Sequence, residues 1–145
     1  MLTDKRPMSK IECNQIHPVV LAFVGDAVYT LYVKERLVLS GEGKVGEFQR
    51  ASAQIVSARG QSAFLDKILP MLTEEETHIF KRGKSAKKAT KSKSASSLEY
   101  NRSTGFEALL GYLYLTGEED RIRELLSHSN EEDFKRIEAV KAFKP

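Results

Sequence analysis

Two carboxylates interrupt the most apolar stretches of this 145-residue chain. Asp26 is the only ionisable residue other than tyrosine between Val19 and Val33, and Glu107 is the only carboxylate in the run STGFEALLGYLYL. A lone carboxylate in apolar surroundings is costly unless it is paired or bound to a metal, and aspartate is a poor residue for a helix interior. One such residue on each of two apolar segments predicts that the segments pack together and that the carboxylates converge.

Two converging carboxylates can hold Mg²⁺, which prefers oxygen ligands and keeps several of its waters. Such an ion can activate a water and stabilise the transition state of phosphodiester hydrolysis. Two alternatives stay open on residue chemistry alone. Either carboxylate can simply reach solvent at the edge of its helix, or it can pair with Arg102 or Lys34.

Two glycines accompany the carboxylates, since Gly25 directly precedes Asp26 and Gly111 follows Glu107 by four residues. Glycine inside a helix costs about 1 kcal/mol relative to alanine. The two positions therefore indicate either a close approach of two helices or access to a ligand.

A third feature is the segment KRGKSAKKATKSKS at 81–94, in which seven residues are basic and none is acidic. The chain has a net charge of +3, which would be −4 without them, so the segment predicts an anionic partner. Lysines and hydroxyls suit phosphate contacts, and the lack of aromatic residues favours a duplex backbone over a stacked single strand. A merely solvated loop and a membrane surface are the alternatives. The candidate RNA-binding residues are Lys81, Arg82, Lys84, Lys87, Lys88, Lys91 and Lys93.

The elements that position these residues are expected to be helices, because no strand pattern is found, and the predicted fold class is all-α in a single domain over residues 1–145. Residues 18–40 are apolar nearly all round, which predicts a central, buried helix with Gly41 as its C-cap. Thr73 and Glu76 form a capping-box pattern. Further helices are expected at 47–58, 61–69, 73–81, 103–115, 118–127 and 131–143, with a basic loop at 81–97 and a polar, loose lead-in at 1–14.

Composition excludes several classes of protein. A single cysteine, Cys13, rules out an intrachain disulfide framework and a cysteine-based zinc site, and the three histidines lack ligand spacing. No apolar run is long enough to span a bilayer, and the N-terminus has no apolar signal region. These features predict a cytoplasmic protein without membrane contact.

The motifs resemble a known family. LAFVGDAVYTLYV is similar to the signature helix of ribonuclease III catalytic domains, roughly L-E-F-L-G-D-[AS]-V-L, and FEALLGYLYL is similar to the second family motif, D-x-x-E-A-L-[IL]-G-x-[IL]-Y. The basic loop after KRG and the lack of room for a double-stranded RNA-binding domain after His128 resemble the Mini-III branch. The resemblance extends from about Pro18 to Glu124.

The resemblance implies an all-helical homodimer that hydrolyses duplex RNA with Mg²⁺ and leaves 5′-phosphates. It places the family aspartate on Asp26 and the family glutamate on Glu107, as catalytic and metal-binding residues. It also implies a role in maturation of large-subunit (23S) ribosomal RNA, aided by a large-subunit ribosomal protein. The chain departs from standard ribonuclease III at Ala22 and Thr104, where that pattern has acidic residues, although Mini-III members share both departures.

The alternative function is a catalytically silent duplex-RNA binder that acts in ribosome assembly and uses the same basic loop. A purely structural helical protein is a third possibility. Neither has an evident reason to keep carboxylates in two apolar helices, so the sequence favours the enzyme.

Overall fold

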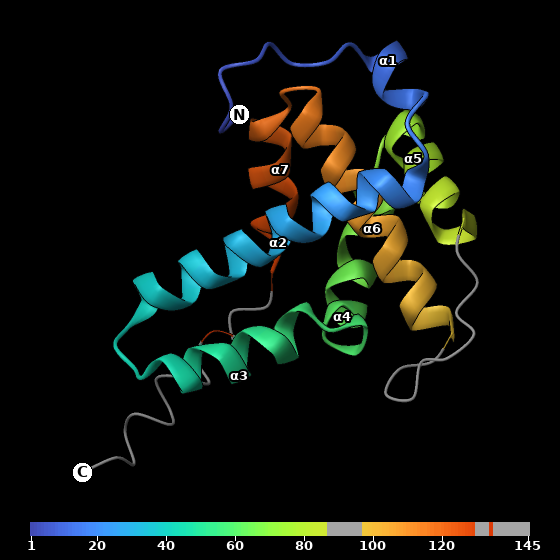
Figure 1. Cartoon of the computed structure of the whole chain (residues 1–145). Coiled ribbons are helices and arrows are strands. Elements are labelled where there is room, and N and C mark those ends of the chain that lie inside the picture. Colours follow the sequence, from blue (N-terminus) through green and yellow to red (C-terminus); the bar gives the residue numbers. More distant parts are fainter. Residues whose placement is uncertain (87–96, 130–133, 135–145) are drawn as a thin grey trace.

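A computed structural model describes residues 1–86, 97–129 and 134, and in these residues all regular structure is helical (Figure 1). The helices are α1 (Lys10–Asn14), α2 (Pro18–Ser40), α3 (Val45–Val56), α4 (Ala58–Ile68), the 3₁₀ helix η1 (Leu69–Met71), α5 (Glu74–Ala86), α6 (Ser97–Leu115) and α7 (Glu119–Leu126). The predicted all-α class is confirmed.

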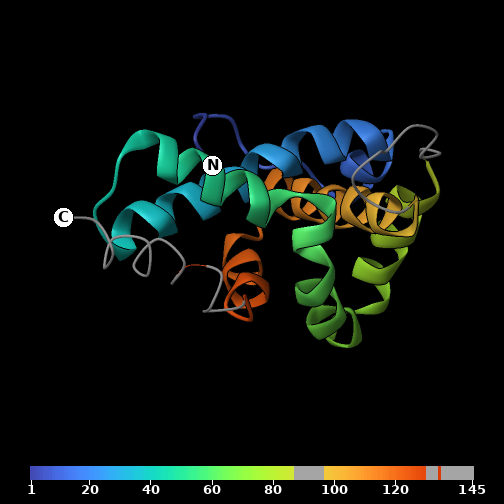
Figure 2. The same cartoon turned by 90° about the horizontal axis from the view of Figure 1, so that it is seen from below.

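The long helices α2 and α6 pack against each other at the centre of the molecule, and the shorter helices are arranged around them. Seen from below, α2 and α6 lie in one layer, while α4, α5 and α7 extend away from it (Figure 2). The apolar core lies where these elements meet, and Leu21, Phe106, Leu109 and Leu125 are fully buried there. No helix in the described part of the chain has the length and apolarity that a membrane crossing needs.

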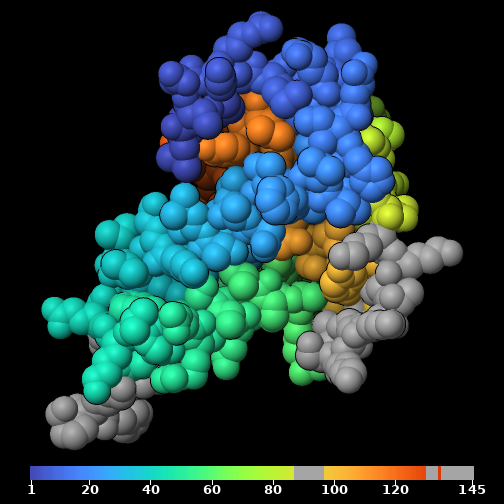
Figure 3. All heavy atoms as spheres, in the orientation of Figure 1, coloured from blue at the N-terminus to red at the C-terminus, as the bar shows by residue number. Residues whose placement is uncertain are grey.

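Helix α2 has the predicted bounds but is not buried all round. Its buried residues recur every three or four positions and include Leu21, Gly25, Tyr29 and Val33. The opposite side exposes large apolar side chains, namely Val20, Phe23, Leu31 and Val38. In the space-filling view α2 crosses the front of the molecule, and no other described element covers the side of α2 that faces the viewer (Figure 3).

The helix ends show which local signals hold. Glu76 N–H donates to Thr73 Oγ1 at 3.1 Å and Thr73 N–H donates to Glu76 Oε1 at 2.9 Å, so the predicted capping box is confirmed. Gly117 adopts a φ of 79°, the left-handed conformation that a glycine cap provides. Gly41 is the C-cap of α2, as predicted, and its backbone is extended there, with a φ of 171°.

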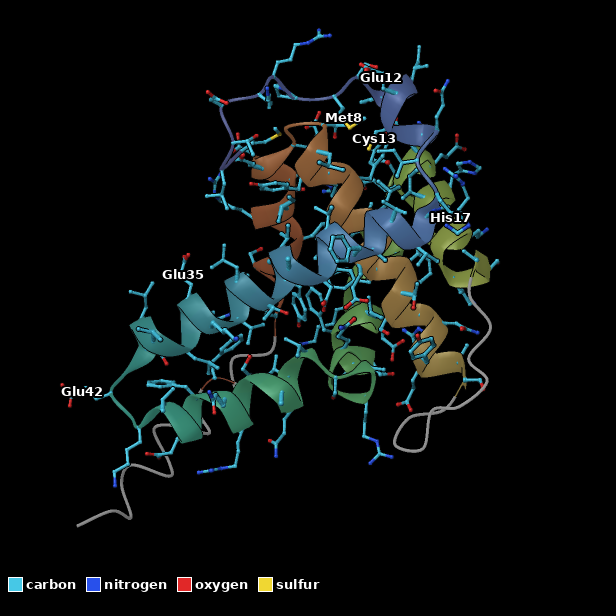
Figure 4. All side chains as sticks on the ribbon, in the orientation of Figure 1. Met8, Glu12, Cys13, His17, Glu35 and Glu42 are labelled. Carbon is cyan, nitrogen blue, oxygen red and sulfur yellow. The ribbon has the colours of Figure 1, made fainter. Side chains whose placement is uncertain are left out.

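The first residues are attached to the body of the molecule and are not the loose lead-in that the sequence predicted. Met8 N–H donates to Leu115 O at 2.8 Å, and Cys13 is fully buried (Figure 4). Ser9 and Glu12 form a capping box that starts α1. Polarity alone did not reveal these contacts because they are made to α6 and the turn after it, far along the chain.

Candidate active site

The site is built where α2 and α6 cross, at two glycines. A Cβ atom at Gly25 would lie 1.6 Å from the carbonyl oxygen of Glu107, and one at Gly111 would lie 1.9 Å from the carbonyl oxygen of Leu21. No other residue fits at either position without moving a backbone. Of the two explanations for these glycines, close helix approach is therefore the correct one, and it brings Asp26 next to Glu107.

A cluster of aromatic rings packs beside the crossing of α2 and α6. The ring of Phe106 packs edge-on against Tyr29 at a centroid distance of 5.3 Å and against Phe64 at 5.4 Å. Such pairs contribute about 0.5–1.5 kcal/mol each beyond their burial. Because the three rings come from α2, α4 and α6, they fix the relative positions of the helices that carry the polar residues of the site.

The predicted convergence of the carboxylates is observed, since the side chains of Asp26 and Glu107 are in hydrogen-bond contact. Burial, together with the charge of Asp26 and the hydrogen bond to it, raises the pKa of Glu107 to about 8, whereas a hydrogen bond with Gln61 acts in the opposite direction. With its pKa raised, the Glu107 carboxyl group keeps its proton to a higher pH than an ordinary glutamic acid does when no cation is bound.

The two carboxylates differ in exposure, and Asp26 is not buried in the core. Asp26 is exposed on the edge of α2, while Glu107 is only partly accessible. The alternative that a carboxylate reaches solvent thus holds for Asp26. The pairing of either with Arg102 is not observed, because the Arg102 guanidinium binds Asp66 at 2.7 Å.

A third polar residue of the site, Gln61 on α4, was missed by the sequence analysis. Its side chain is fully buried and lies near enough to Glu107 to lower the pKa of that carboxyl group. A signal existed, because Gln61 lies on the same helical face as the buried residues Phe64, Leu65 and Ile68. A buried amide in such a stripe needs polar partners.

The donor set fits a magnesium ion. Mg²⁺ is usually held by one or two carboxylates together with waters and substrate phosphates, and Asp26 and Glu107 supply two. The amide oxygen of Gln61 is buried and has no hydrogen-bond partner among the described residues, which leaves an acceptor on a side chain that touches Glu107. In the described part of the chain, no group of three or more acidic, histidine or cysteine side chains is placed so that it could hold a metal ion.

The two positions that are acidic in standard ribonuclease III do not add ligands. Ala22 is buried on α2, one turn before Asp26. Thr104 is buried on α6, and its hydroxyl donates to Tyr100 O at 3.1 Å within the same helix. The hydroxyl is thus already bonded to its own helix.

The basic segment begins on a helix rather than in a loop. Helix α5 continues to Ala86, because Gly83 packs against Gly105 and Ala108 of α6 and so prolongs the buried face of α5. The loop predicted from residue 81 to 97 is therefore wrong at residues 81–86 and at residue 97. The predicted residues Lys87, Lys88, Lys91 and Lys93 lie outside the described residues.

The three described basic residues have different roles. Lys81 is exposed and Lys84 is partly exposed near the end of α5, so both can reach an anionic ligand. Arg82 instead donates to the carbonyl oxygens of Asn14 at 3.0 Å and Ile16 at 3.5 Å, which fixes the segment between α1 and α2. Arg82 thus has a structural role, and its assignment to RNA binding stays a prediction.

Comparison with known proteins identifies the fold and the site together. Residues 19–118 match the sequence profile of the Ribonuclease III domain, a span that contains both glycines and both carboxylates. The chain belongs to the ribonuclease III family. This family is generally metal-dependent, in agreement with the donor set at the crossing of α2 and α6.

Relatives place the chain in the Mini-ribonuclease 3 branch of the ribonuclease III family. It is 41% identical to Mini-ribonuclease 3 of Brevibacillus brevis over 116 residues, which cover 80% of this chain and 87% of that protein. It is 45% identical to Mini-ribonuclease 3 of Symbiobacterium thermophilum over 109 residues, 75% of this chain and 84% of that protein. The expected family is confirmed, and the chain is an endoribonuclease of the ribonuclease III family.

A solved structure shows the same architecture. A crystal structure of a protein from Fusobacterium nucleatum superposes with a TM-score of 0.71 at 30% sequence identity, over 78% of this chain and 90% of that one.

Proposed function

We propose that this member of the ribonuclease III family is a Mg²⁺-dependent endoribonuclease that cuts double-stranded RNA, with Asp26 and Glu107 as its catalytic, metal-binding carboxylates. The observation that carries the proposal is their contact at a glycine-lined crossing of two helices. A partly buried carboxyl group beside a second carboxylate is a poor structural element, because the pair offers less attraction than an ion pair and costs desolvation. A divalent cation is the partner that makes both carboxylates favourable.

Asp26 and Glu107 have different roles in this proposal. Asp26 is exposed, so the scissile phosphate can approach it from solvent. Glu107 is held from the protein side by Gln61 and by the packing of α6. The bound Mg²⁺ would supply charge stabilisation and an activated water for hydrolysis of the phosphodiester to a 5′-phosphate.

The basic segment is proposed to bind the duplex backbone. Lys81 and Lys84 lie near the end of α5, and residues 87–93 contribute four more lysines in sequence. Contacts of this kind position a duplex and carry no base information.

We further propose a homodimer formed through the exposed apolar side of α2. Phe23 is 79% exposed there, close to Asp26 on the same helix. Large exposed apolar patches on a chain of this size mark interaction surfaces. Two sites related by a two-fold axis would face the two strands of one duplex.

The biological substrate proposed is the precursor of large-subunit (23S) ribosomal RNA, processed by residues 1–145 acting as one catalytic domain with the aid of a large-subunit ribosomal protein. The support is the kinship with the Mini-ribonuclease 3 proteins.

One assay tests the activity. Purified protein is incubated with a labelled RNA duplex and with the single strand of the same sequence, each with Mg²⁺ and with chelator. We expect cleavage only of the duplex and only with Mg²⁺, and none by Asp26→Asn or Glu107→Gln, whose amides cannot replace anionic ligands. Unchanged cleavage by Asp26→Asn would remove the proposed site.

A further inference from the structure

Gln61 is the most unusual residue near the site that has no assigned role. Its side chain is 0% exposed, in a position of α4 where the neighbouring buried residues Phe64, Leu65 and Ile68 are apolar. A buried amide must find hydrogen bonds, since each polar group left without one costs free energy. A leucine or methionine would pack at this position without that requirement.

A tight junction between α3 and α4 fixes the position of this amide. Ser57 ends α3 and also caps α4, because its hydroxyl donates to Gln54 O at 2.8 Å and accepts from Gly60 N–H at 3.0 Å. A Cβ at Gly60 would lie 2.1 Å from Gln54 O, so only glycine allows so tight a junction. The junction delivers the next residue, Gln61, into the core beside α6.

The nitrogen of the amide connects two elements. Gln61 Nε2 donates to Val56 O, the last carbonyl of α3, at 2.9 Å. The same side chain lies near enough to the Glu107 carboxyl group on α6 to lower its pKa. These two contacts tie the carboxyl group to the α3–α4 junction.

Packing does not explain why the amide oxygen of Gln61 is buried. Gln61 Oε1 is buried, and no donor among the described residues bonds to it. The site beside it suits a hydrated cation, and the waters of Mg²⁺ are hydrogen-bond donors. Groups that hydrogen-bond to metal ligands or to their waters orient the site and commonly affect metal affinity.

We propose that Gln61 is a positioning residue for the metal site: its nitrogen orients the Glu107 carboxylate, and its oxygen accepts a hydrogen bond from a water of the bound cation. The inference rests on the proposed function, because it takes Asp26 and Glu107 as the ligands.

A purely structural role for Gln61 predicts something different. If the amide served only to cap α3 through Val56 O, its loss would loosen the α3–α4 junction and leave cation binding unchanged. Cation affinity without RNA therefore separates the two roles, whereas cleavage activity alone would not.

The experiment measures Mn²⁺ binding to the full chain without RNA, from the electron paramagnetic resonance signal of the free ion. Gln61→Met keeps the side-chain size and removes both hydrogen-bonding groups. We expect its Mn²⁺ dissociation constant to rise about 10–100-fold, the usual effect of losing a group that supports a metal ligand. Ser57→Ala is the matched control, because it weakens the same junction without touching Glu107, and its affinity should equal that of the wild type.

Two results would overturn the inference: a folded Gln61→Met protein with wild-type affinity, or an equal loss of affinity in Ser57→Ala. If Gln61→Met does not fold, the wild-type protein gives the answer by NMR. The side-chain amide signals of Gln61 should shift as Mg²⁺ is added, and should not shift in Asp26→Asn. Signals that stay in place through a saturating titration would refute the role.

The Asp26→Asn protein also separates this inference from the proposed function. If Asp26→Asn binds Mn²⁺ as the wild type does, the proposed metal site itself is wrong, and the role of Gln61 falls with it. If Asp26→Asn loses binding while Gln61→Met keeps it, the metal site stands and only the positioning role of Gln61 is rejected.

Discussion

At the scale of single residues, the contact between Asp26 and Glu107 makes the protein sensitive to pH in a defined direction. Burial and the neighbouring charge raise the pKa of Glu107 to about 8 in the folded chain, while its ordinary value is 4.5. Between these values the folded protein holds more protons than the unfolded chain. Linkage then requires that metal-free stability fall as the pH rises through this window.

We predict that the free energy of unfolding of the metal-free wild type decreases from pH 5 to pH 8 relative to that of Glu107→Gln. The slope of the difference cannot exceed about 1.4 kcal/mol per pH unit, the value for one proton. Urea unfolding of both proteins in chelator at several pH values measures it. Saturating Mg²⁺ should stabilise the wild type more at pH 8 than at pH 5, because a cation favours the ionised pair. If the difference in free energy of unfolding between the two proteins does not change with pH, the raised pKa of Glu107 is contradicted.

The sequence predicted these residues only in part. Asp26 and Glu107 were found because each is the sole carboxylate in an apolar run, and this anomaly is visible without coordinates. The exposure of Asp26 was left open as one of two alternatives, because an apolar run does not reveal which side of a helix meets solvent. The structural contacts of Arg82 were missed for a related reason, since its carbonyl partners on Asn14 and Ile16 lie more than sixty residues away.

At the scale of elements, the close crossing of α2 and α6 depends on two glycines. We predict that Gly25→Ala destabilises the protein by about 3 kcal/mol or more, at or above the upper end of the usual overpacking cost, because its Cβ would meet a backbone carbonyl at 1.6 Å. Gly46→Ala is the matched control. There the nearest atom to the added Cβ is Nη1 of Arg50, 3.5 Å away on a flexible side chain.

Gly46 lies inside α3, so alanine there should be neutral or stabilising by up to about 1 kcal/mol. Urea denaturation of the two variants and the wild type gives the comparison. Equal stability of Gly25→Ala and Gly46→Ala would show that the helices can separate at the crossing without cost.

Helix ends were predictable where the signal is local and failed where packing decides. The capping box at Thr73 and Glu76 depends on residues three apart, and the bounds of α2 follow from Pro18 and the polar loop after Ser40. The end of α5 was placed too early because the polar sequence after Lys81 hides a buried glycine. Gly83 faces α6, a contact between segments more than twenty residues apart.

At the scale of the whole molecule, the exposed apolar side of α2 predicts self-association. We expect Phe23→Glu to give a folded monomer by sedimentation, since it places a charge in the centre of the proposed interface. Ile11→Glu is the control, because Ile11 is 75% exposed and lies on α1, outside that surface. A wild type that sediments as an active monomer at assay concentrations would contradict the dimer, as would dissociation by Ile11→Glu alone.

The distribution of charge over the molecule predicts how RNA is captured. The segment 81–94 contains seven basic residues and no carboxylate, so its contribution should be electrostatic rather than chemical. Each phosphate contact releases counterions, with a slope of about −0.9 in log K against log[salt] for B-form DNA, and a similar trend is expected for duplex RNA. Replacing Lys84, Lys87, Lys88 and Lys91 by alanine should therefore weaken binding of all duplex sequences alike. It should also flatten the salt dependence by at most about three to four units.

Single-turnover cleavage at saturating RNA should change little in this variant, because the carboxylate site is untouched. A charge-matched control replaces Lys5, Lys10, Lys34 and Lys67, which lie elsewhere in the chain, and it should keep a steeper salt dependence. Filter binding across a salt series and rapid-quench kinetics measure the two quantities. Equal slopes in both variants would show that the segment is merely solvated. A collapse of the saturated cleavage rate would mean that its lysines help place the scissile phosphate, because capture is already complete at saturation and only the chemical step remains to be slowed.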